Sequence, residues 1–284
     1  MDGKSTPKRH LQRSALSPFR YPGGKSWLWP IILQWLNPKP NILVEPFAGG
    51  ANTTLAAVSE KIAKKAIIIE LDLQVASVWE AVLNGQADWL ARKVRSFHMT
   101  RRAVKTELKR LPKRPRDSAW LTLLRNRVNH GGILAEGAGL LKQGERGNGI
   151  ISRWYPETLC NRIRIANSLK SRIQFISGDG LEWLENNGMK ARFSAAAFFI
   201  DPPYRKAGQR LYSKNELDHR RLFEIASRLP GRVLMTYENT HEIRSLVTEF
   251  GFKLKRVKMC SRQNTKKKEL LISKDFSWLS SRTS

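Results

Sequence analysis

Two successive strand-and-helix units near the N-terminus are the feature that most restricts the fold of this chain. Residues 41–62, NILVEPFAGGANTTLAAVSEKI, read as an apolar strand, a glycine turn and a helix, and residues 64–83, KKAIIIELDLQVASVWEAVL, repeat the pattern. An apolar strand followed by a helix, twice over, is typical of parallel strands in an α/β sheet. The strand pattern returns at RIQFISGD, FSAAAFFIDPPY and GRVLMTYEN, and FKLKRVKMCSRQNTKKKELLIS reads as two strands joined by a basic turn. The sequence therefore predicts one α/β core.

A basic segment of different character interrupts this core. From Arg92 to Arg116 the chain holds eleven Lys and Arg and a single acid, Glu107, before a glycine-dense segment. We expect an inserted, mostly helical lobe here. The predicted organisation is a basic flexible arm, a core in two parts and the lobe between those parts: residues 1–18, residues 19–84 with 173–284, and residues 85–172.

The overall charge indicates an anionic partner. The chain holds 51 Lys and Arg against 24 Asp and Glu, a formal net charge of +27, which favours nucleic acid because each neutralised phosphate releases counterions. No apolar run approaches the ~20 residues that span a bilayer, and MDGKSTPKRH lacks the apolar core of a signal peptide. We expect a cytoplasmic protein that is associated with nucleic acid and not with a membrane. The cysteines, Cys160 and Cys260, match no metal or redox spacing, and we expect no metal.

The stretch FRYPGGKSW, from Phe19 to Trp27, ends like the phosphate-binding loop G-x-x-x-x-G-K-[ST]. The first glycine of that loop would fall at Phe19, and phenylalanine cannot adopt the glycine conformation or let the backbone approach a phosphate closely. Residues 1–17 are polar and basic, so no apolar strand precedes the stretch. These differences disfavour an ATPase, and the stretch needs another explanation.

The strongest chemical signal is FFIDPPY. The apolar strand delivers Asp201 to the carboxyl edge of the sheet, where α/β proteins bind ligands. Pro202 and Pro203 remove two backbone donors, so the carbonyls of this segment can accept from a ligand, and Tyr204 adds a flat amphipathic ring. Acceptors beside a ring suit a planar substrate with an amino group, such as a nucleobase. The alternative is a proline turn with a capping aspartate.

Two further strand ends carry acids beside a glycine turn. In VEPFAGGAN, a strand, a glycine turn and a helix start would expose backbone amides to a cofactor, without the G-x-G-x-x-G fingerprint of dinucleotide sites. Glu70 ends the next strand, where an acid can accept hydrogen bonds from ribose hydroxyls. Asp179, in ISGDG, ends another strand. Each acid is also explained as an ordinary strand-end surface residue.

The segments YPGGK, EPFAGG, IIIE and DPPY, in that order, resemble the Dam-type DNA adenine methyltransferases, and LYSKNELDHRRL, MTYEN and KKKELLIS are similar to that family's carboxyl-terminal sequences. The resemblance covers about residues 19–84 and 175–274. It implies a Rossmann-like, S-adenosylmethionine-dependent methyltransferase sheet, with a target-recognition lobe between the glycine turn and DPPY. One difference is Ala51, which ends Phe47-Ala48-Gly49-Gly50-Ala51 where relatives often carry glycine.

The resemblance also implies roles for individual residues. Tyr21 and Lys25 would line the pocket for S-adenosylmethionine, Glu70 would hold the ribose, and Asp179 would lie near the cofactor adenine. The expected cofactor-binding residues are Tyr21, Pro22, Gly23, Gly24, Lys25, Glu45, Pro46, Phe47, Ala48, Gly49, Gly50, Glu70, Leu71, Asp179, Gly180 and Asp201. The expected catalytic residues are Asp201, Pro202, Pro203 and Tyr204.

The expected reaction is direct transfer of the sulfonium methyl to N6 of adenine in double-stranded DNA. Asp201 and the Pro202 carbonyl would accept the two amine protons, and Tyr204 would stack on a base flipped out of the duplex. Arg125, Arg127, Asn129 and His130 form a short polar stretch that could read bases in the major groove. No endonuclease signature is evident, so a cognate restriction enzyme would be another chain.

Other acceptors and another class stay open on the residues alone. DPPY is compatible with transfer to N4 of cytosine or to adenine in RNA. Carbon-5 methylation is disfavoured because Cys160 and Cys260 do not lie in a nucleophile loop, and both read as packing residues. The alternative from a different class is a non-catalytic DNA-binding protein with the same fold.

Overall fold

The fold is built around a seven-stranded mixed sheet. The computed structural model describes residues 16–20, 25–135, 137–144, 147–203, 217–260 and 266–280. The sheet has the order β3-β2-β1-β4-β5-β7-β6, and β7 pairs antiparallel with both β5 and β6 while the other neighbours are parallel. The strands are β1 (Ile42–Glu45), β2 (Lys65–Glu70), β3 (Ile173–Ser177), β4 (Ala197–Ile200), β5 (Arg232–Glu238), β6 (Lys253–Cys260) and β7 (Lys266–Ser273). The predicted Rossmann-like α/β fold and the closing pair of strands are confirmed.

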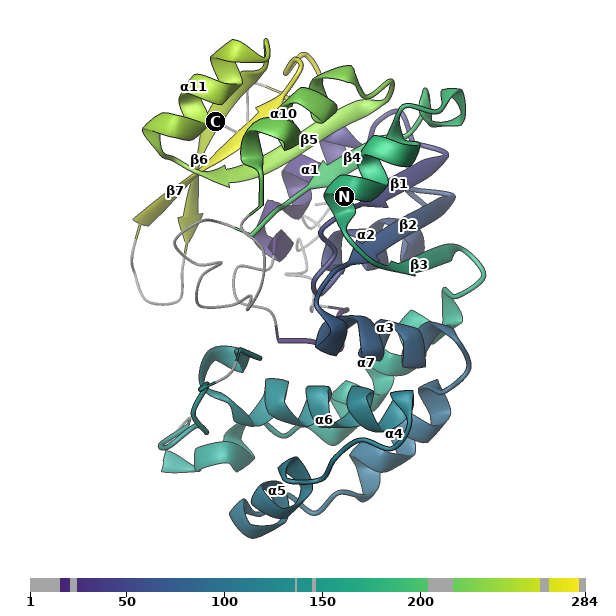
Figure 1. The fold of residues 1–284 in the computed structure, drawn as a ribbon, viewed down its shortest axis with the longest axis vertical. Helices are drawn as coiled ribbons and strands as arrows, with labels where there is room; N and C mark the ends of the chain where they lie inside the picture. Colours follow the sequence, from purple (N-terminus) through teal and green to yellow (C-terminus); the bar gives the residue numbers. More distant parts are fainter. Residues whose placement is uncertain are drawn as a thin grey trace, which may run out of the picture.

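Helices cover both faces of the sheet (Figure 1). The helices of the core are α1 (Trp29–Trp35), α2 (Asn52–Ser59), α3 (Leu73–Leu83), α8 (Gly180–Trp183), α10 (His219–Arg228) and α11 (His241–Glu249). Short turns of other helical types are η1 (Lys25–Leu28), η2 (His130–Gly132), η4 (Gly149–Arg153), η5 (Leu184–Gly188) and η6 (Ala191–Phe193). Pro30 lies in the first turn of α1, where its fixed φ and missing N–H are compatible with a helix.

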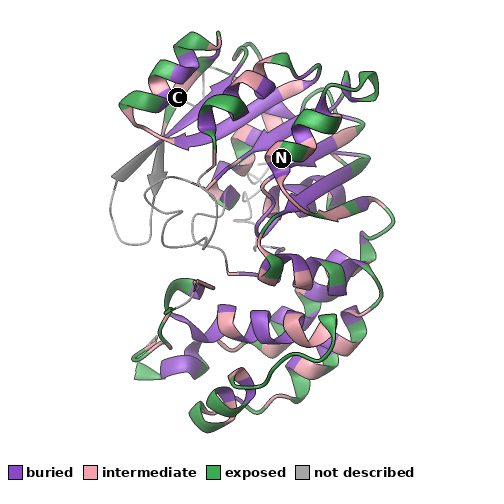
Figure 2. Ribbon diagram, in the orientation of Figure 1, coloured by how far each residue is buried: buried purple, intermediate pink, exposed green. Residues whose placement is uncertain are grey.

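Alternate residues of each central strand enter different hydrophobic cores. On β4, Phe199 joins the core that contains residues of α1, α2 and α3, whereas Phe198 and Ile200 join the core that contains residues of α10 and α11. Successive strand side chains point to opposite faces of the sheet. Because both faces are covered, these strands are continuous apolar runs rather than alternating patterns. Figure 2 shows the buried strands between partly exposed helices.

The interrupting segment folds into a helical lobe beside α3. Its helices are α4 (Ala87–Ser96), α5 (Arg101–Leu108), α6 (Pro115–Val128) and α7 (Pro156–Ser168). Figure 1 shows α3 and α7 between the sheet and the rest of the lobe. Phe97, Trp120 and Trp154 pack edge to face with ring centroids 5.1 to 6.2 Å apart. The lobe shares one continuous buried cluster with α1, α2 and α3, so the lobe is packed on the core rather than tethered to it.

The end of the predicted N-terminal arm is packed, which corrects the arm's boundary. Ser17 and Phe19 are buried, and the Ser17 amide donates to Asn52 Oδ1 at 3.1 Å. A guanidinium N–H of Arg127 donates to the Pro18 carbonyl. A flexible arm therefore does not extend to residue 18, because this backbone has partners inside the protein. Residues 1–15 lie outside the described residues.

Within the described ranges, none of the helices combines the length and the hydrophobicity that crossing a bilayer requires.

Candidate functional site

The acids that the sequence singles out share one edge of the sheet. Glu45 ends β1, Glu70 ends β2, and Asp201 directly follows β4. These strands are adjacent and parallel in the order β3-β2-β1-β4, so their carboxyl ends meet at the same edge. The order along the sheet reverses between β1 and β4, which is where open α/β sheets bind ligands.

The glycine turn after β1 is fixed to β2 and to α3. The Ala48 amide donates to the Ile69 carbonyl at 2.9 Å, and the Gly49 amide donates to Glu70 Oε2 at 2.6 Å. From the other side, Trp79 Nε1 donates to the Gly49 carbonyl at 2.8 Å. Gly49 has a φ of 46°, as a tight turn requires. The turn before α2 is thus held in one conformation.

Ala51 adopts the backbone conformation for which glycine is better suited. Its φ is 46° and its ψ is 32°, in the left-handed region, and it is the N-cap residue of α2. Its side chain is buried. Left-handed backbone costs an alanine roughly 1–2 kcal/mol because Cβ crowds the carbonyl oxygen. The difference from the family pattern therefore falls at a strained position.

Glu70 holds this turn with both carboxylate oxygens. Besides the bond from Gly49, Oε1 accepts from the Asp72 amide at 2.8 Å. Burial raises the pKa of Glu70 to about 7, against the effect of the backbone hydrogen bonds. Leu71, the next residue, leaves 47 % of its surface exposed. A carboxylate can accept from the ribose hydroxyls of a nucleoside, and an exposed apolar side chain can pack against its base. Glu70 also holds the glycine turn through its backbone contacts.

Glu45, the second acid of the pair, is as deeply buried as Glu70. Its Oε2 accepts from the Thr54 amide at 3.2 Å and from the Thr54 hydroxyl at 2.6 Å. Burial raises its pKa to about 8, and the charges of Asp201 and Glu70 add to this increase. Glu45 therefore fastens the first turn of α2 to β1.

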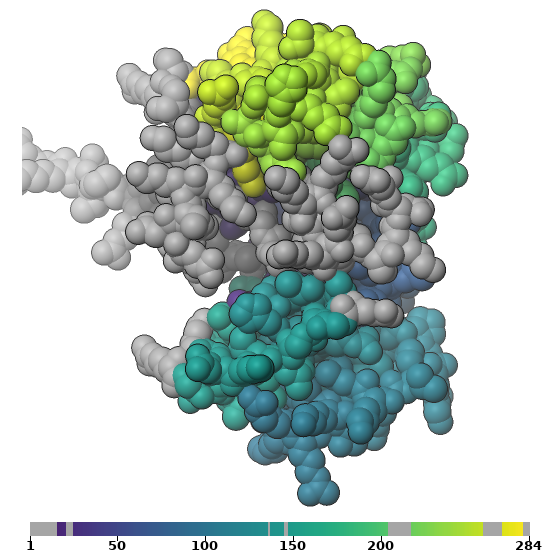
Figure 3. Space-filling view, turned by 60° about the vertical axis from the view of Figure 1, so that its left-hand side comes forward, coloured from purple at the N-terminus to yellow at the C-terminus, as the bar shows by residue number. Residues whose placement is uncertain are grey.

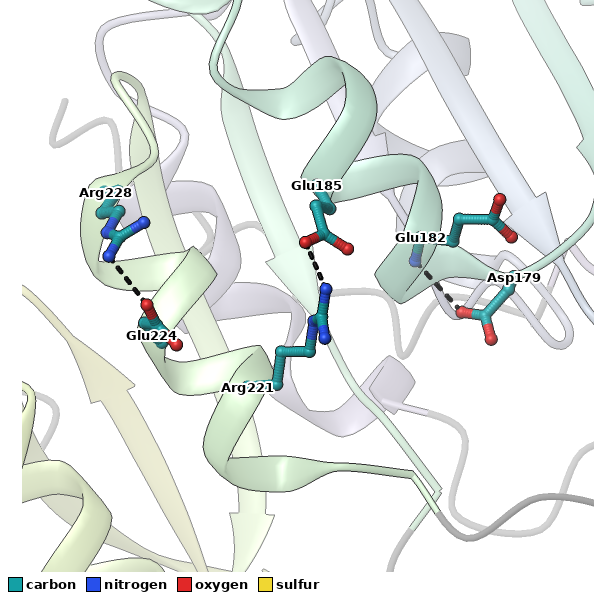
Figure 4. Close-up of polar contacts among 6 residues, drawn as sticks. All are labelled: Asp179, Glu182, Glu185, Arg221, Glu224 and Arg228. Carbon is teal, nitrogen blue, oxygen red and sulfur yellow. Dashed lines mark hydrogen bonds and ion pairs between the residues drawn. The ribbon is translucent and has the colours of Figure 1, made fainter.

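Asp179 caps a helix at the edge of the same site. Its Oδ1 accepts from the Leu181 amide at 2.7 Å and from the Glu182 amide at 3.3 Å, as Figure 4 shows in part. The next residue, Gly180, has no room for a side chain, because a Cβ there would lie 1.8 Å from the Pro46 carbonyl oxygen. The start of α8 therefore lies directly against the glycine turn.

Figure 4 also shows two exposed ion pairs beyond this cap. Arg221 on α10 pairs with Glu185, and Arg228 pairs with Glu224 at 2.7 Å within α10. Exposed pairs of this kind typically contribute ~0–1 kcal/mol. The first pair joins α10 to η5 and the second lies within α10, and neither pair includes a residue of the site.

Asp201 belongs to a buried polar cluster that the sequence only partly indicates. Lys25 Nζ lies 3.0 Å from Asp201 Oδ1 and 3.7 Å from Glu269 Oε1. The Thr236 hydroxyl donates to Asp201 Oδ1 at 2.5 Å. Thr236 and Glu269 are not among the predicted site residues. They lie in MTYEN and KKKELLIS, the late segments that resemble the family, and that position was the one signal for them in the sequence.

Several predicted residues lie outside the described residues. These are Tyr21, Pro22, Gly23, Gly24 and Tyr204, whose predicted roles stay predictions. The other predicted residues of these two segments lie at the sheet edge. Pro46, Ala48, Gly50 and Pro202 are buried, and Phe47 and Pro203 are half-buried.

The four residues predicted to read DNA bases do not form one exposed stretch. Arg127 is buried on α6, and burial lowers the pKa of its guanidinium to about 9, with Arg162 and Arg20 adding to the effect. Asn129 is buried and donates to the Ile133 carbonyl at 2.8 Å. For these two residues the prediction is corrected: the segment is the last turn and cap of a packed helix. His130 is exposed, and half-buried Arg125 donates to Gln74 Oε1 at 3.3 Å.

Among the described residues, no group of three or more His, Cys, Asp or Glu side chains could hold a metal ion.

Comparisons with known proteins find similar folds at low identity. No family model and no curated protein matches the chain. Among solved structures, the rRNA methyltransferase AviRa from Streptomyces viridochromogenes matches with a TM-score of 0.43 and 10% identity over 93% of this chain and 91% of that one. The M1A22 tRNA methyltransferase TrmK from B. subtilis matches with a TM-score of 0.36 and 14% identity over 85% and 64%.

A third similar structure is the precorrin-6y C5,15-methyltransferase from Geobacter metallireducens GS-15, with a TM-score of 0.39 and 7% identity over 87% of each chain. These scores are too low to transfer a function, so the fold assignment rests on the strand order of this chain.

Proposed function

We propose that this chain is an S-adenosylmethionine-dependent methyltransferase that methylates N6 of adenine in double-stranded DNA. The observation that carries the proposal is the placement of Asp201. It follows β4 at the point where strand order reverses, it is held by Lys25, and it shares the sheet edge with the Glu70-bound glycine turn. A carboxylate beside a cofactor-type turn suits transfer to an amine.

The described residues fit the cofactor chemically. Glu45, Glu70 and Asp201 place carboxyl oxygens along this edge, and such oxygens can accept hydrogen bonds from the hydroxyl and amino groups of the cofactor. Glu70 accepts from the backbone N–H groups of Gly49 and Asp72 and also interacts with that of Leu71, and because a carboxylate offers about four acceptor sites, a ribose hydroxyl can still donate to it. The contact between Gly180 and Pro46 brings a second strand end against the turn. When bound, the cofactor would supply an activated methyl group.

Asp201 would act on the acceptor amine rather than on the methyl group. The lone pair of an exocyclic amine is delocalised into the base, which makes the nitrogen a poor nucleophile. Asp201 and the Pro202 carbonyl accept hydrogen bonds from its two N–H groups, which draws the nitrogen towards a tetrahedral geometry and frees the lone pair. After the methyl group moves from sulfur to nitrogen, the methylated amine loses one proton to solvent. Preorganised acceptors that face developing positive charge are a common electrostatic strategy, and alignment of the reacting atoms lowers the barrier further.

Double-stranded DNA as the partner is supported by where the cations lie. Many cations of the lobe are exposed on α4, on α5 and on the loop after α5: Arg92, Arg95, Arg101, Arg102, Lys105, Lys109, Arg110, Lys113 and Arg114. The blue and teal lobe forms the lower half of the face in Figure 3. Contacts from such side chains to phosphates position a duplex without reading its sequence. Flipping the base would cost a few kcal/mol.

The experiment that tests the proposal identifies the methylated nucleoside. The purified chain is incubated with S-adenosylmethionine that carries a labelled methyl group, and with long mixed-sequence duplex DNA, duplex DNA without adenine, or RNA. After digestion to nucleosides, the proposal predicts label in N6-methyladenine from the mixed-sequence duplex alone. Label in N4-methylcytosine would identify cytosine as the acceptor, and label only in RNA would identify RNA as the substrate; either result would contradict the proposal. Absence of both label and cofactor binding would favour the non-catalytic DNA-binding protein.

A further inference from the structure

We propose that Thr236 and Glu269 are positioning residues that orient Asp201 and preserve its negative charge for the acceptor amine. The inference rests on the proposed function, because it gives Asp201 the task described above. It concerns two residues that come from β5 and β7, outside the DPPY segment. Both are buried, although a polar side chain gains nothing from burial in an apolar core unless it has a polar partner.

Thr236 is placed beside Asp201 by the register of the sheet. Ile200 on β4 pairs with Met235 on β5, so the following residues, Asp201 and Thr236, are neighbours across the strands. Thr236 is 0 % exposed, and its hydroxyl hydrogen donates to Asp201 Oδ1 at 2.5 Å. A hydrogen bond to an ionised acceptor is short and strong. Thr236 therefore fixes the rotation of the Asp201 carboxylate.

Lys25 and Glu269 set the charge of the cluster. The Lys25 ammonium is buried with a side-chain exposure of 5 %, and it lies close to both Asp201 and Glu269. Glu269 pairs in register with Glu238 on β5, so it approaches Lys25 from the antiparallel part of the sheet. A buried ammonium needs a counter-charge. Because Glu269 shares this ammonium, the three groups sum to one negative charge rather than to zero.

The division of tasks follows from these contacts. A one-to-one pair with Lys25 would weaken Asp201 as an acceptor, since the ammonium would compensate its charge. Because Glu269 takes up part of the ammonium, Asp201 keeps more of its strength as an acceptor at the rim, where 23 % of its side chain is exposed. Thr236 holds the carboxylate plane while Lys25 holds its position. Loss of either partner would misplace or weaken the acceptor without removing it.

The kinetic test compares Thr236→Val, Thr236→Ser and Glu269→Gln with the wild type. Valine keeps the shape of threonine without the hydroxyl, so we expect kcat for DNA methylation to fall at least ~10-fold with KM for S-adenosylmethionine little changed. Serine keeps the donor and should restore most of kcat. E269Q should also lower kcat. The control is Ser273→Ala, which removes the buried hydroxyl that donates to the Val233 carbonyl at 2.9 Å at the other end of β5.

The proposal would be overturned if T236V had the same kcat as S273A, or if T236S did not restore kcat relative to T236V. Either would show that Thr236 serves the core alone.

A second measurement does not depend on activity. In a double-mutant cycle by urea unfolding, T236V should reduce the folded-to-unfolded ratio at least ~5-fold in the wild-type background and much less in D201A, because a contact can be lost only once. Equal effects in both backgrounds would overturn the proposed contact. If the wild type methylates nothing, the proposed function fails, while the cycle still decides whether Thr236 and Asp201 act as a pair.

Discussion

Glu45 and Glu70 show how single buried carboxylates make this site sensitive to pH. Both accept hydrogen bonds that fasten the glycine turn or the helix after it, and burial raises the pKa of each. A carboxyl whose pKa is raised on folding binds a proton more tightly in the folded protein than in the unfolded chain. Its favourable contribution is complete below pH 4.5, the ordinary value, and is lost as pH rises through the folded pKa.

Glu45→Gln isolates the larger of these two effects. Glutamine can accept both Thr54 bonds on its one carbonyl oxygen, because Glu45 takes both on Oε2. Relative to E45Q, the wild type should lose free energy of unfolding as pH rises from 4.5 to about 8, by ~1.4 kcal/mol for each tenfold difference in proton affinity between the folded and unfolded states. Urea unfolding from pH 5 to pH 9 measures this. Parallel curves for the two proteins would contradict a raised pKa for Glu45.

Ala51 gives a second prediction at the scale of one residue. Ala51→Gly relieves left-handed strain but loosens the unfolded chain, so its free energy of unfolding should match the wild type or exceed it by up to ~1 kcal/mol. Ala51→Val should lose ~2 kcal/mol or more, because a β-branched residue fits this backbone poorly. Chemical unfolding of both variants measures the difference. A51G that is clearly less stable than A51V would contradict the assignment of strain to this position.

At the scale of elements, α6 connects the lobe to the segment that precedes the predicted cofactor loop. Asn126 is buried on α6. Its side chain accepts from the Arg20 amide at 2.8 Å, and it donates to the Arg20 carbonyl at 3.0 Å and to the Gly132 carbonyl at 2.8 Å. The next residues along the chain are Tyr21 to Lys25. The lobe therefore anchors the backbone from which the predicted cofactor residues extend.

Asn126→Ala should weaken cofactor binding without touching the cofactor. Removing one side chain leaves the buried Gly132 carbonyl without this partner, at ~1–3 kcal/mol, and the partly buried amide and carbonyl of Arg20 as well, which releases the segment before Tyr21. We expect affinity for S-adenosylmethionine in calorimetry to fall about 10-fold or more. Asn187→Ala is the matched control, because it removes a bond to the Trp183 carbonyl at 3.2 Å away from this segment. Equal affinities for the two variants would exclude the anchoring role.

The elements of the core were predictable because their patterns are local. Apolar runs that are followed by an acid mark the parallel strands. The burial of two of the predicted base-reading residues could not be predicted, because nothing in the sequence distinguishes Arg127 from a surface arginine. Only tertiary packing shows that α6 carries it into the interior, against the backbone of Pro18. Thr236 was missed for the same reason, since strand pairing alone brings it to Asp201.

At the scale of the molecule, charge is distributed unevenly between the site and the surface. The chain carries a formal charge of +27, yet the sheet edge gathers Glu45, Glu70 and Asp201. The exposed cations lie on the lobe, whereas the carboxyl oxygens lie at the sheet edge. A long-range attraction for DNA and a set of hydrogen-bond acceptors for a ligand can then coexist in one protein.

This arrangement predicts which cations set the salt dependence of DNA binding. Arg102→Ala with Lys105→Ala, on exposed α5, should weaken DNA binding for all sequences and reduce the slope of log K against log salt by ~1–2. Lys64→Ala with Lys65→Ala removes equal charge at the amino edge of β2, which is the opposite edge of the sheet. Binding isotherms at several salt concentrations should leave the control slope unchanged. The same loss in both variants would indicate only a general charge effect.

The most direct test of the proposed chemistry is the single-turnover rate of methyl transfer by Asp201→Asn at saturating S-adenosylmethionine and DNA. Asparagine keeps the size of aspartate and can still accept from Thr236, and Lys25 keeps Glu269 as its partner. We predict a rate at least ~100-fold below the wild type. A near wild-type rate for D201N would contradict the claim that this carboxylate activates the acceptor amine.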